Sequence, residues 1–476
     1  MYSFPDAAAV LGAGLQAPDP SRLISGASID TRTLEKGNLF VALRGVKEDG
    51  HRYLAQAFSK GASGALIEKE FFERNLKELE GYSNLLSVQD TFASFTALAK
   101  AYRSRFKIPT AGITGSVGKT STKEFLHFLL SQNRNVLATR GNFNNHLGLP
   151  LTLFGLNESH QACVAELGAN HKGEIRELAS VLKPDHAILT CVAPVHLSGF
   201  GSLEGIYEAK LELFESLRPG STAVIPDDDA VLFARAGRMG LHVVRVGQSP
   251  LADYRISEVR VLEGLVHFRV NGRPYAFPGI AKFLARNAAM AIALAEAMGM
   301  KISEIPAVWT NFILPSGRFQ SRLLENGVTL IDDGYNASPV SFKAALEVFS
   351  GFPAAGRRVL VFADMLELGS EEIHYHEELG EKIANAGLDL ILAYGPLAGR
   401  AIQKIKSVNS SLHALHFEGP RDIAAFLRNR LKRGDMMLLK ASRGMKIEEV
   451  TNLLSFPHDF RRESIILLIP DKSIRG

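Results

Sequence analysis

Short apolar runs alternate with amphipathic or polar segments along most of the chain. Residues 88–106 place apolar side chains at helical spacing, which predicts a helix, and they lead into the β-branched run at 108–114. Further apolar runs follow at 136–139, 162–167, 186–193 and 222–226, with room for a crossover helix between them. Strands and helices that alternate in this way predict a mainly parallel sheet with helices on both faces.

The flanking parts of the chain show related patterns. Residues 1–86 alternate short apolar runs with turn signals, which predicts a small α/β module. Apolar and polar positions alternate on both sides of Asn271–Gly272, a strong hairpin signal, and an alanine-rich helix that ends at Gly299 follows. Four apolar runs between residues 328 and 442 predict a second doubly wound domain. We therefore expect an α/β protein with domains at 1–86, 87–314 and 315–476.

Composition argues against several classes of protein, including nucleic-acid binders, disulfide-rich proteins and membrane proteins. A length of 476 residues agrees with about three domains, and 54 Lys and Arg against 50 Asp and Glu give a net charge of +4. This balance is too even for the basic footprint of a nucleic-acid binder. Two cysteines exclude a disulfide framework and suit a reducing compartment. The first residues do not form a signal peptide, and no apolar run approaches 18 residues, so we expect a cytoplasmic protein without membrane insertion. The apolar run at 465–470 is expected to form a terminal strand or a docked tail.

A phosphate-binding loop opens the predicted central domain. Residues 111–122 read AGITGSVGKTST, directly after a predicted strand and at a helix start. Small residues let backbone N–H groups surround phosphate oxygens, Lys119 can reach the β- and γ-phosphates, and the Thr120 hydroxyl can ligate Mg²⁺. Ile113 stands where the strict motif has its first glycine, so this is a variant loop. The competing interpretation is a glycine-rich connection without a ligand.

Two further side chains end predicted parallel strands, where ligands bind in such sheets. Glu166 ends the run at 162–167, and His196 follows the run at 186–193. Either is a candidate Mg²⁺ ligand, or a solvated loop residue. By itself, Lys210 reads as a surface lysine of an amphipathic helix. His374 and His376 are two apart, face different directions on a helix and are expected to be surface or interdomain residues.

Several long strings together resemble the ATP-dependent Mur ligases of peptidoglycan synthesis. They include GITGSVGKTSTKE, RGNFNNHLGLPLTL, AELGANHKGEIREL, IDDGYNASPVSF and KASRGMKIEEV, and DTRTLEKGNLFVALRG lies in the first module. Within the family, the strings are most similar to those of members that add D-alanyl-D-alanine to a UDP-N-acetylmuramoyl tripeptide. The resemblance implies a UDP-muramoyl-peptide-binding domain, a central P-loop ATPase domain and a C-terminal Rossmann-like domain that closes over ATP and binds the dipeptide. It also implies ligation through an acyl phosphate, by a monomer.

The resemblance implies roles for individual residues. Lys119 would contact the β- and γ-phosphates, Thr120 a first Mg²⁺, Glu166 both Mg²⁺ ions and His196 a second one. Lys210 matches the family lysine that is carbamylated and would support the second Mg²⁺. The implied nucleotide-binding residues are Gly115, Ser116, Val117, Gly118, Lys119, Thr120, Ser121, Asn287, Arg318 and Asp333. The implied substrate-binding residues are Asp30, Thr31, Arg32, Asp49, His51, Asn145, Tyr335, Asn336, Ser442 and Arg443. Lys119, His196, Lys210 and Arg318 are the implied catalytic residues.

Each role has a simpler competitor. The competing interpretation of Arg318 is a linker cation, Asp333 and Asn336 can shape a turn, and Ser442–Arg443 can cap a helix. Two departures from the family pattern, at residues 283–287 and at Pro226, leave adenine recognition open. Rival functions are a folylpolyglutamate-type ligase, which lacks the N-terminal module, and a nucleotide-binding scaffold without ligase chemistry. The sequence leaves open whether the third residue of the tripeptide is diaminopimelate or lysine.

Overall fold

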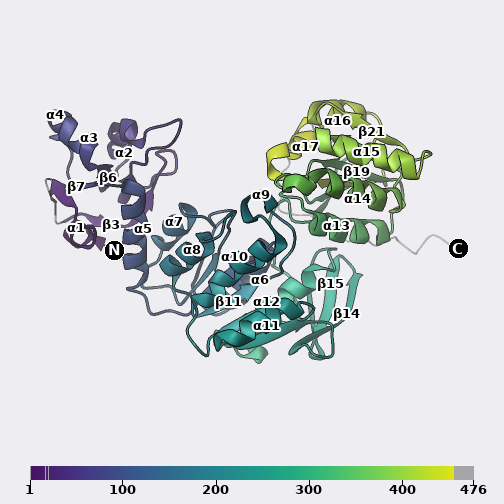
Figure 1. The fold of residues 1–476 in the computed structure, drawn as a ribbon, viewed down its shortest axis with the longest axis horizontal. Coiled ribbons are helices and arrows are strands. Elements are labelled where there is room, and N and C mark those ends of the chain that lie inside the picture. The colour runs from purple at the N-terminus through teal and green to yellow at the C-terminus, as the bar shows by residue number, and fades with distance from the viewer. Residues whose placement is uncertain (1, 17, 20, 455–476) are drawn as a thin grey trace.

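The computed structural model describes residues 2–16, 18–19 and 21–454. Three large sheets follow one another along the chain, and Figure 1 shows an N-terminal lobe in purple, a central lobe in teal and a C-terminal lobe in green and yellow. A further two-stranded sheet pairs residues 2–3 with residues 23–24 in the N-terminal lobe. This confirms the predicted α/β fold class. The predicted tail at 465–470 lies outside the described residues. No helix within the described ranges is long and apolar enough to cross a membrane.

The N-terminal lobe is built on a five-stranded sheet with the order β2-β7-β6-β5-β4. Strands β4 to β7 are parallel neighbours, and β2 is antiparallel to β7. The predicted boundary at residue 86 falls inside β7, so we place the end of this domain after that strand. Its elements are β1 (Tyr2–Ser3), α1 (Phe4–Leu11), β2 (Gly14–Gln16), β3 (Leu23–Ile24), β4 (Gly26–Ser28), β5 (Asn38–Val41), η1 (Gly50–Tyr53), α2 (Leu54–Ser59), β6 (Gly64–Glu68), α3 (Lys69–Arg74), α4 (Leu76–Leu79) and β7 (Leu85–Val88).

The central lobe contains a nine-stranded sheet with the order β16-β15-β14-β13-β12-β11-β8-β10-β9. Its elements are α5 (Thr91–Arg103), β8 (Thr110–Thr114), α6 (Lys119–Leu130), β9 (Val136–Ala138), α7 (Gly148–Leu153), β10 (Ala162–Glu166), α8 (Glu174–Leu182), β11 (His186–Leu189), α9 (Leu197–Phe200), α10 (Leu203–Glu215), β12 (Thr222–Pro226), α11 (Ala230–Ala236), η2 (Gly237–Met239), β13 (His242–Gly247), β14 (Tyr254–Leu262), β15 (Leu265–Val270), β16 (Arg273–Pro278), α12 (Leu284–Ala297) and η3 (Ile302–Glu304). Strands β8 to β14 pair in parallel, as predicted.

The predicted hairpin is present and gains a third strand. Strands β15 and β16 pair antiparallel around Asn271 and Gly272, whose positive φ angles of 49° and 80° suit a tight two-residue turn. Strand β14 pairs antiparallel with β15 on the other side. The antiparallel extension is therefore three strands wide, because β14 belongs both to the parallel sheet and to this meander.

Strand β8 lies at the point where the sheet order changes direction. It is flanked by β10 and β11, so the crossovers on its two sides leave in opposite directions. Such a switch point leaves a crevice at the carboxyl ends of the strands, where ligands bind. Behind it, α6 packs against the alanine-rich α12, most of whose side chains are small and buried. The phosphate loop therefore starts from a rigid base.

The C-terminal lobe has a six-stranded sheet with the order β17-β18-β22-β19-β20-β21. All neighbours are parallel except β17 and β18. Its elements are β17 (Gln320–Leu323), β18 (Thr329–Asp332), α13 (Pro339–Gly351), β19 (Arg358–Ala363), η4 (Gly369–Glu371), α14 (Glu372–Ala384), β20 (Leu390–Tyr394), α15 (Pro396–Val408), β21 (Ala414–Phe417), α16 (Pro420–Leu427), β22 (Met436–Lys440), η5 (Arg443–Met445) and α17 (Glu448–Leu453). The predicted second doubly wound sheet is present.

Candidate active site

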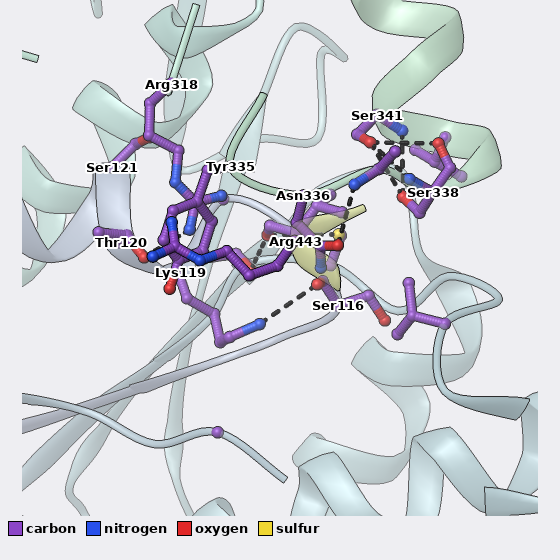
Figure 2. A pocket seen from close by; sticks show the side chains of 18 of the residues that line it. Ser116, Lys119, Thr120, Ser121, Arg318, Tyr335, Asn336, Ser338, Ser341 and Arg443 are labelled. Carbon is purple, nitrogen blue, oxygen red and sulfur yellow. Dashed lines mark hydrogen bonds between the residues drawn. The ribbon is translucent and has the colours of Figure 1, made fainter. Parts of the chain in front are cut away.

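A cavity of about 730 Å³ lies between the central and C-terminal lobes. The phosphate loop, the strand ends at Glu166 and His196, and helix α12 form its central-domain side. Arg318 and the loops after β18, β19 and β22 form the other side, and Figure 2 shows Arg318, Tyr335 and Arg443 together beside Lys119 and Thr120. The structure therefore brings together residues that are up to about 330 positions apart in the chain.

The phosphate loop requires glycine at two positions. Gly115 has a φ of 141°, and a Cβ there would lie 2.0 Å from the Thr190 Oγ1 atom. Gly118 has a φ of 84°, and a Cβ would lie 2.4 Å from the Asn287 Nδ2 atom. Ile113, which replaces the first glycine of the strict motif, is buried within β8. The tight part of the loop thus begins after Ile113, and the departure from the motif does not disturb it.

Neighbouring strand ends hold the loop in shape. The Ser116 hydroxyl donates to the carbonyl of Ala193 at 2.8 Å, and the Thr190 hydroxyl donates to the carbonyl of Val117 at 2.6 Å. The Asn287 amide donates to the Gly118 carbonyl at 3.0 Å and to the Thr122 hydroxyl at 2.8 Å. Asn287 lines the cavity, but its amide supports the loop, so the structure gives it a positioning contact.

Lys119 and the first turn of α6 make the loop a site for anions. The Lys119 ammonium donates to the carbonyls of Gly115 at 2.8 Å and Ser116 at 3.2 Å. Burial lowers the pKa of Lys119, and the negative charge of Glu166 acts in the opposite direction. Helix α6 begins after Gly118, which offers no side chain to cap its first N–H groups. Those N–H groups and the helix dipole favour a phosphate.

Glu166 is a buried carboxylate at the end of β10. Its side chain is nearly inaccessible, and Oε1 accepts a hydrogen bond of 2.7 Å from the Asn144 amide. The Oε2 atom is buried and has no hydrogen-bond partner among the described residues. A buried acceptor without a donor is costly, and a Mg²⁺ ion would satisfy it. The residues present therefore fit the predicted metal.

The predicted substrate residue Asn145 has a local contact as well. Its Oδ1 accepts from the backbone N–H groups of Leu147 at 3.2 Å and Gly148 at 2.9 Å, where α7 begins. Asn145 also lines the cavity. Its neighbour Asn144, which the sequence analysis did not select, is the one that contacts Glu166.

No group of three or more His, Cys, Asp or Glu side chains in the described part of the chain could hold a metal ion by itself.

His196 lines the cavity, whereas Lys210 is buried outside its lining. His196 lines it, and its Nδ1 atom contacts a carboxylate oxygen of Glu367 from the C-terminal lobe. Lys210 is 1% exposed on α10 and does not line the cavity. Its ammonium lies 5.0 Å from the centroid of the Phe200 ring. The surface-lysine interpretation is therefore wrong, because the helix turns Lys210 inward.

Burial lowers the pKa of both groups. For His196 the desolvation outweighs the opposing charge of Glu367. For Lys210, desolvation with a further contribution from Lys119 lowers the pKa from 10.5 to about 7. A substantial fraction of Lys210 is therefore neutral near pH 7, which is the form that can react with carbon dioxide.

Arg318 reaches across the interdomain cavity. Its Nη2 atom donates to the Thr120 hydroxyl at 3.1 Å, and its guanidinium lies 4.0 Å from the centroid of the Tyr335 ring. The Arg443 guanidinium lies 5.2 Å from the same ring (Figure 2). Arg318 therefore contacts the phosphate loop directly and is not a free linker cation. Tyr335 orders two guanidinium groups through its ring.

Asp333 forms a buried ion pair that the sequence analysis missed. The Lys440 ammonium lies 2.5 Å from the Asp333 Oδ2 atom and 3.2 Å from the carbonyl of Asn336, and Lys440 is 1% exposed. Burial raises the pKa of Asp333, against the charge of Lys440. Lys440 ends β22 just before Ser442, and its position after an apolar run was the available signal.

The remaining C-terminal residues have defined contacts. The Asn336 side chain is exposed at the cavity and accepts from the N–H of Ala337. The Ser442 hydroxyl accepts from the N–H of Leu366 at 2.9 Å. Ser442 occupies the N-cap position of η5, but its side chain makes no capping bond there.

The predicted residues of the N-terminal lobe lie in two local groups. Asp30 pairs with Arg32 at 2.6 Å, and that hydrogen-bonded guanidinium lowers the pKa of Asp30 to about 2. Thr31 donates to the Gln56 side chain at 2.8 Å. Both ring nitrogens of His51 are engaged, Nδ1 with Asp49 at 2.6 Å and Nε2 with the backbone N–H of residue 68 at 3.0 Å. His51 is buried, and its two hydrogen bonds join the start of η1 to the end of β6. Asp49 and Arg32 are more accessible than His51.

One histidine prediction is wrong. His376 is fully buried on α14, where its Nε2 accepts from the N–H of Met365 at 2.9 Å and its Nδ1 contacts the carbonyl of Glu372 at 2.7 Å. It joins α14 to the loop after β19 and is not a surface residue. His376 shares the buried face of α14 with Leu379 and Ile383, and this helical spacing was the available signal.

Family models match the three lobes in order. The Mur ligase family catalytic domain matches residues 23–103, the Mur ligase middle domain 113–295 and the Mur ligase glutamate ligase domain 317–443. The UDP-N-acetylmuramoyl-tripeptide–D-alanyl-D-alanine ligase of Bacillus subtilis is 33% identical over 430 residues, which cover 90% of this chain and 92% of that protein. With its phosphate loop and interdomain cavity, this chain belongs to the Mur ligase family.

Among solved structures, the chain is similar to two MurF ligases. MurF from Acinetobacter baumannii has a TM-score of 0.83 at 27% identity, covering 95% of this chain and 98% of that one. MurF from Thermotoga maritima, solved in complex with ADP, has a TM-score of 0.76 at 29% identity, covering 90% and 96%. The predicted similarity to the D-alanyl-D-alanine-adding members is confirmed.

Proposed function

We propose that this protein is an ATP-dependent ligase that joins D-alanyl-D-alanine to a UDP-N-acetylmuramoyl tripeptide, giving the pentapeptide precursor of peptidoglycan. The observation that carries the proposal is the contact of Arg318 with Thr120, which brings a C-terminal guanidinium to the phosphate loop of the central domain. An ATP γ-phosphate at this loop would be surrounded by Lys119, Arg318 and the first N–H groups of α6.

The proposed reaction must first activate a carboxylate, which has no good leaving group. The terminal carboxylate of the tripeptide is a poor electrophile, so an oxygen of that group attacks the γ-phosphorus, ADP leaves and an acyl phosphate forms. The dipeptide amine attacks the acyl carbon, loses a proton, and inorganic phosphate leaves with the electron pair of the broken C–O bond. Lys119 and Arg318 hold and neutralise the phosphoryl oxygens, so their contribution is positioning and charge stabilisation.

Thr120 and Glu166 are the residues that would hold a first Mg²⁺, and His196 a second. Bound Mg²⁺ neutralises phosphate charge and orients the oxygens that react. The support from this chain is the buried, unpaired Oε2 atom of Glu166. Lys210 would support the second ion after its neutral amine adds carbon dioxide and releases a proton, which converts a buried neutral amine into an anion.

The first lobe is proposed to bind the UDP-muramoyl part of the substrate, with Asp30, Thr31, Arg32, Asp49 and His51 as its site. Tyr335, Asn336, Ser442 and Arg443 are proposed for the dipeptide, because they line the C-terminal side of the cavity. We also propose that the protein acts as a monomer. Both cysteines are free thiols, as expected for a cytoplasmic enzyme.

The direct test measures phosphate release by the purified protein with ATP, Mg²⁺, UDP-muramoyl tripeptide and D-alanyl-D-alanine. We expect release to require both acceptors and to match the amount of pentapeptide formed. Release that is no greater than with either acceptor omitted would refute the ligase function, and ATP binding without such release would favour the scaffold. Competition between the diaminopimelate- and lysine-containing tripeptides then identifies the accepted third residue.

A further inference from the structure

The loop after β19 supplies a carboxylate to the opposite domain. Glu367 lies in this loop with a φ of 66°, and His196 has a φ of 49° at the start of α9. Both residues therefore hold a left-handed backbone conformation that non-glycine residues rarely adopt. The Glu367 carboxylate meets Nδ1 of His196, and both side chains line the interdomain cavity.

Backbone contacts place the two segments against each other around this pair. A Cβ at Gly369, two residues beyond Glu367, would lie 3.5 Å from the backbone nitrogen of Ser198. Helix α9 and the 3-10 helix η4 are in contact. The side-chain pair is thus part of a packed junction, and the two long side chains do not merely meet in solvent.

The pair also selects which ring nitrogen of His196 is free. With Nδ1 facing the carboxylate, that nitrogen carries the proton, and Nε2 is the nitrogen left to bind a ligand. The Phe200 ring lies edge-on to the imidazole, with centroids 6.5 Å apart. A histidine that binds a metal ion commonly donates its other N–H to a carboxylate in just this way.

We infer that Glu367 is a positioning residue that orients His196 from the C-terminal domain, so that the second metal position is complete only when the two domains are together. The inference rests on the proposed function, because it assumes that His196 binds the ion. Neither the sequence pattern nor the matched motifs assigned a role to Glu367. The alternative is an ordinary exposed ion pair, since the Glu367 side chain is 53% exposed, and such pairs contribute little.

The test uses Glu367→Gln, which keeps the shape and an accepting oxygen but removes the charge. Glu371→Gln is the matched control, because Glu371 is an exposed carboxylate at the end of η4, in the same connection. Bound Mn²⁺ is counted by electron paramagnetic resonance with a β,γ-imido ATP analogue and UDP-muramoyl tripeptide present. We expect Glu367→Gln to lower the affinity for one of the two Mn²⁺ ions by about 10- to 100-fold and to leave the affinity for the other unchanged. The control should match the wild-type protein.

A double-mutant cycle separates action through His196 from a general effect on the cavity. In a His196→Ala background, Glu367→Gln should cause no further loss of Mn²⁺ affinity, because the residue it orients is absent. In the active protein, kcat should fall about 10- to 100-fold while the KM for ATP changes less than threefold.

Equal Mn²⁺ binding by wild type and Glu367→Gln would overturn the inference, as would a full additional loss in the His196→Ala background. Thermal unfolding of each variant checks the fold, and Glu367→Asp provides a second variant if Glu367→Gln unfolds. Absence of ligase activity in the wild-type protein would overturn the proposed function instead, and the Mn²⁺ measurements do not depend on turnover.

Discussion

Lys210→Met tests a buried lysine of α10 whose pKa is strongly lowered. The structure buries Lys210 and lowers its pKa from 10.5 to about 7. The unfolded chain therefore binds a proton that the folded chain releases, and stability rises as the pH increases from 7 toward 10.5. At pH 7 the shift corresponds to a penalty of about 4 kcal/mol relative to a neutral group, from 1.36 kcal/mol for each pKa unit.

Methionine removes the buried charge and retains most of the side-chain volume. It also removes the contact of the ammonium with the Phe200 ring, worth about 1 kcal/mol. We therefore expect Lys210→Met to be more stable than the wild-type protein by about 3 kcal/mol at pH 7, within the range found when buried ions are replaced by apolar groups. The advantage should shrink by about 1–2 kcal/mol at pH 8.5, because the amine of the folded wild-type protein is then mostly neutral.

The assay is thermal and urea unfolding of both proteins at pH 7 and pH 8.5, in buffer freed of carbon dioxide so that no carbamate forms. Lys107→Met, which removes an exposed lysine of the central domain, is the control and should change the stability by less than about 0.5 kcal/mol. If Lys210→Met is less stable than the wild type at pH 7, or if the difference does not depend on pH, the argument from burial is refuted. Ligase activity should be lost in Lys210→Met and in Lys210→Ala, and added bicarbonate should not restore it.

Three further substitutions test other contacts. Glu166→Gln keeps an acceptor for Asn144 but replaces the unpaired oxygen with an amide, so kcat should fall about 100-fold in phosphate-release assays, and a fall of less than threefold would contradict a role in charge stabilisation. Asp333→Asn leaves Lys440 buried without its counter-ion and should cost about 3–5 kcal/mol of unfolding free energy, measured by urea denaturation; an unchanged midpoint would contradict the buried pair. Arg318→Lys cannot preserve the planar stacking on Tyr335 together with the Thr120 contact, so kcat should drop at least tenfold at saturating ATP, whereas an unchanged kcat would exclude a role at the γ-phosphate.

The sequence predicted correctly the features that depend on local backbone geometry. The hairpin formed at Asn271–Gly272 because these residues accept positive φ angles that most others avoid. The phosphate loop formed between β8 and α6 because glycines at 115 and 118 permit contacts that a Cβ would block. Even the departure at Ile113 was harmless for a local reason, since that residue belongs to the strand.

Side chains that depend on distant partners were harder to predict. The ion pair of Asp333 was not predicted, because its partner Lys440 is 107 positions away in the chain. No role was predicted for Glu367, because its carboxylate contacts a histidine that lies 171 positions earlier in another domain. A hydrophobic pattern identifies elements and faces, but it does not give the relative placement of two sheets.

The sequence by itself determined the α/β class, the strand that leads into the phosphate loop, and the residues that resemble those of the Mur ligases. These properties depend on short-range periodicity, backbone conformation and recognisable strings. Only the tertiary structure decided that Lys210 is buried with a lowered pKa, that Arg318 reaches Thr120, and that Glu367 faces His196. Burial and long-range contact arise when separate domains pack together, and desolvation then alters the charge of a group in a way that its neighbours in the chain do not reveal.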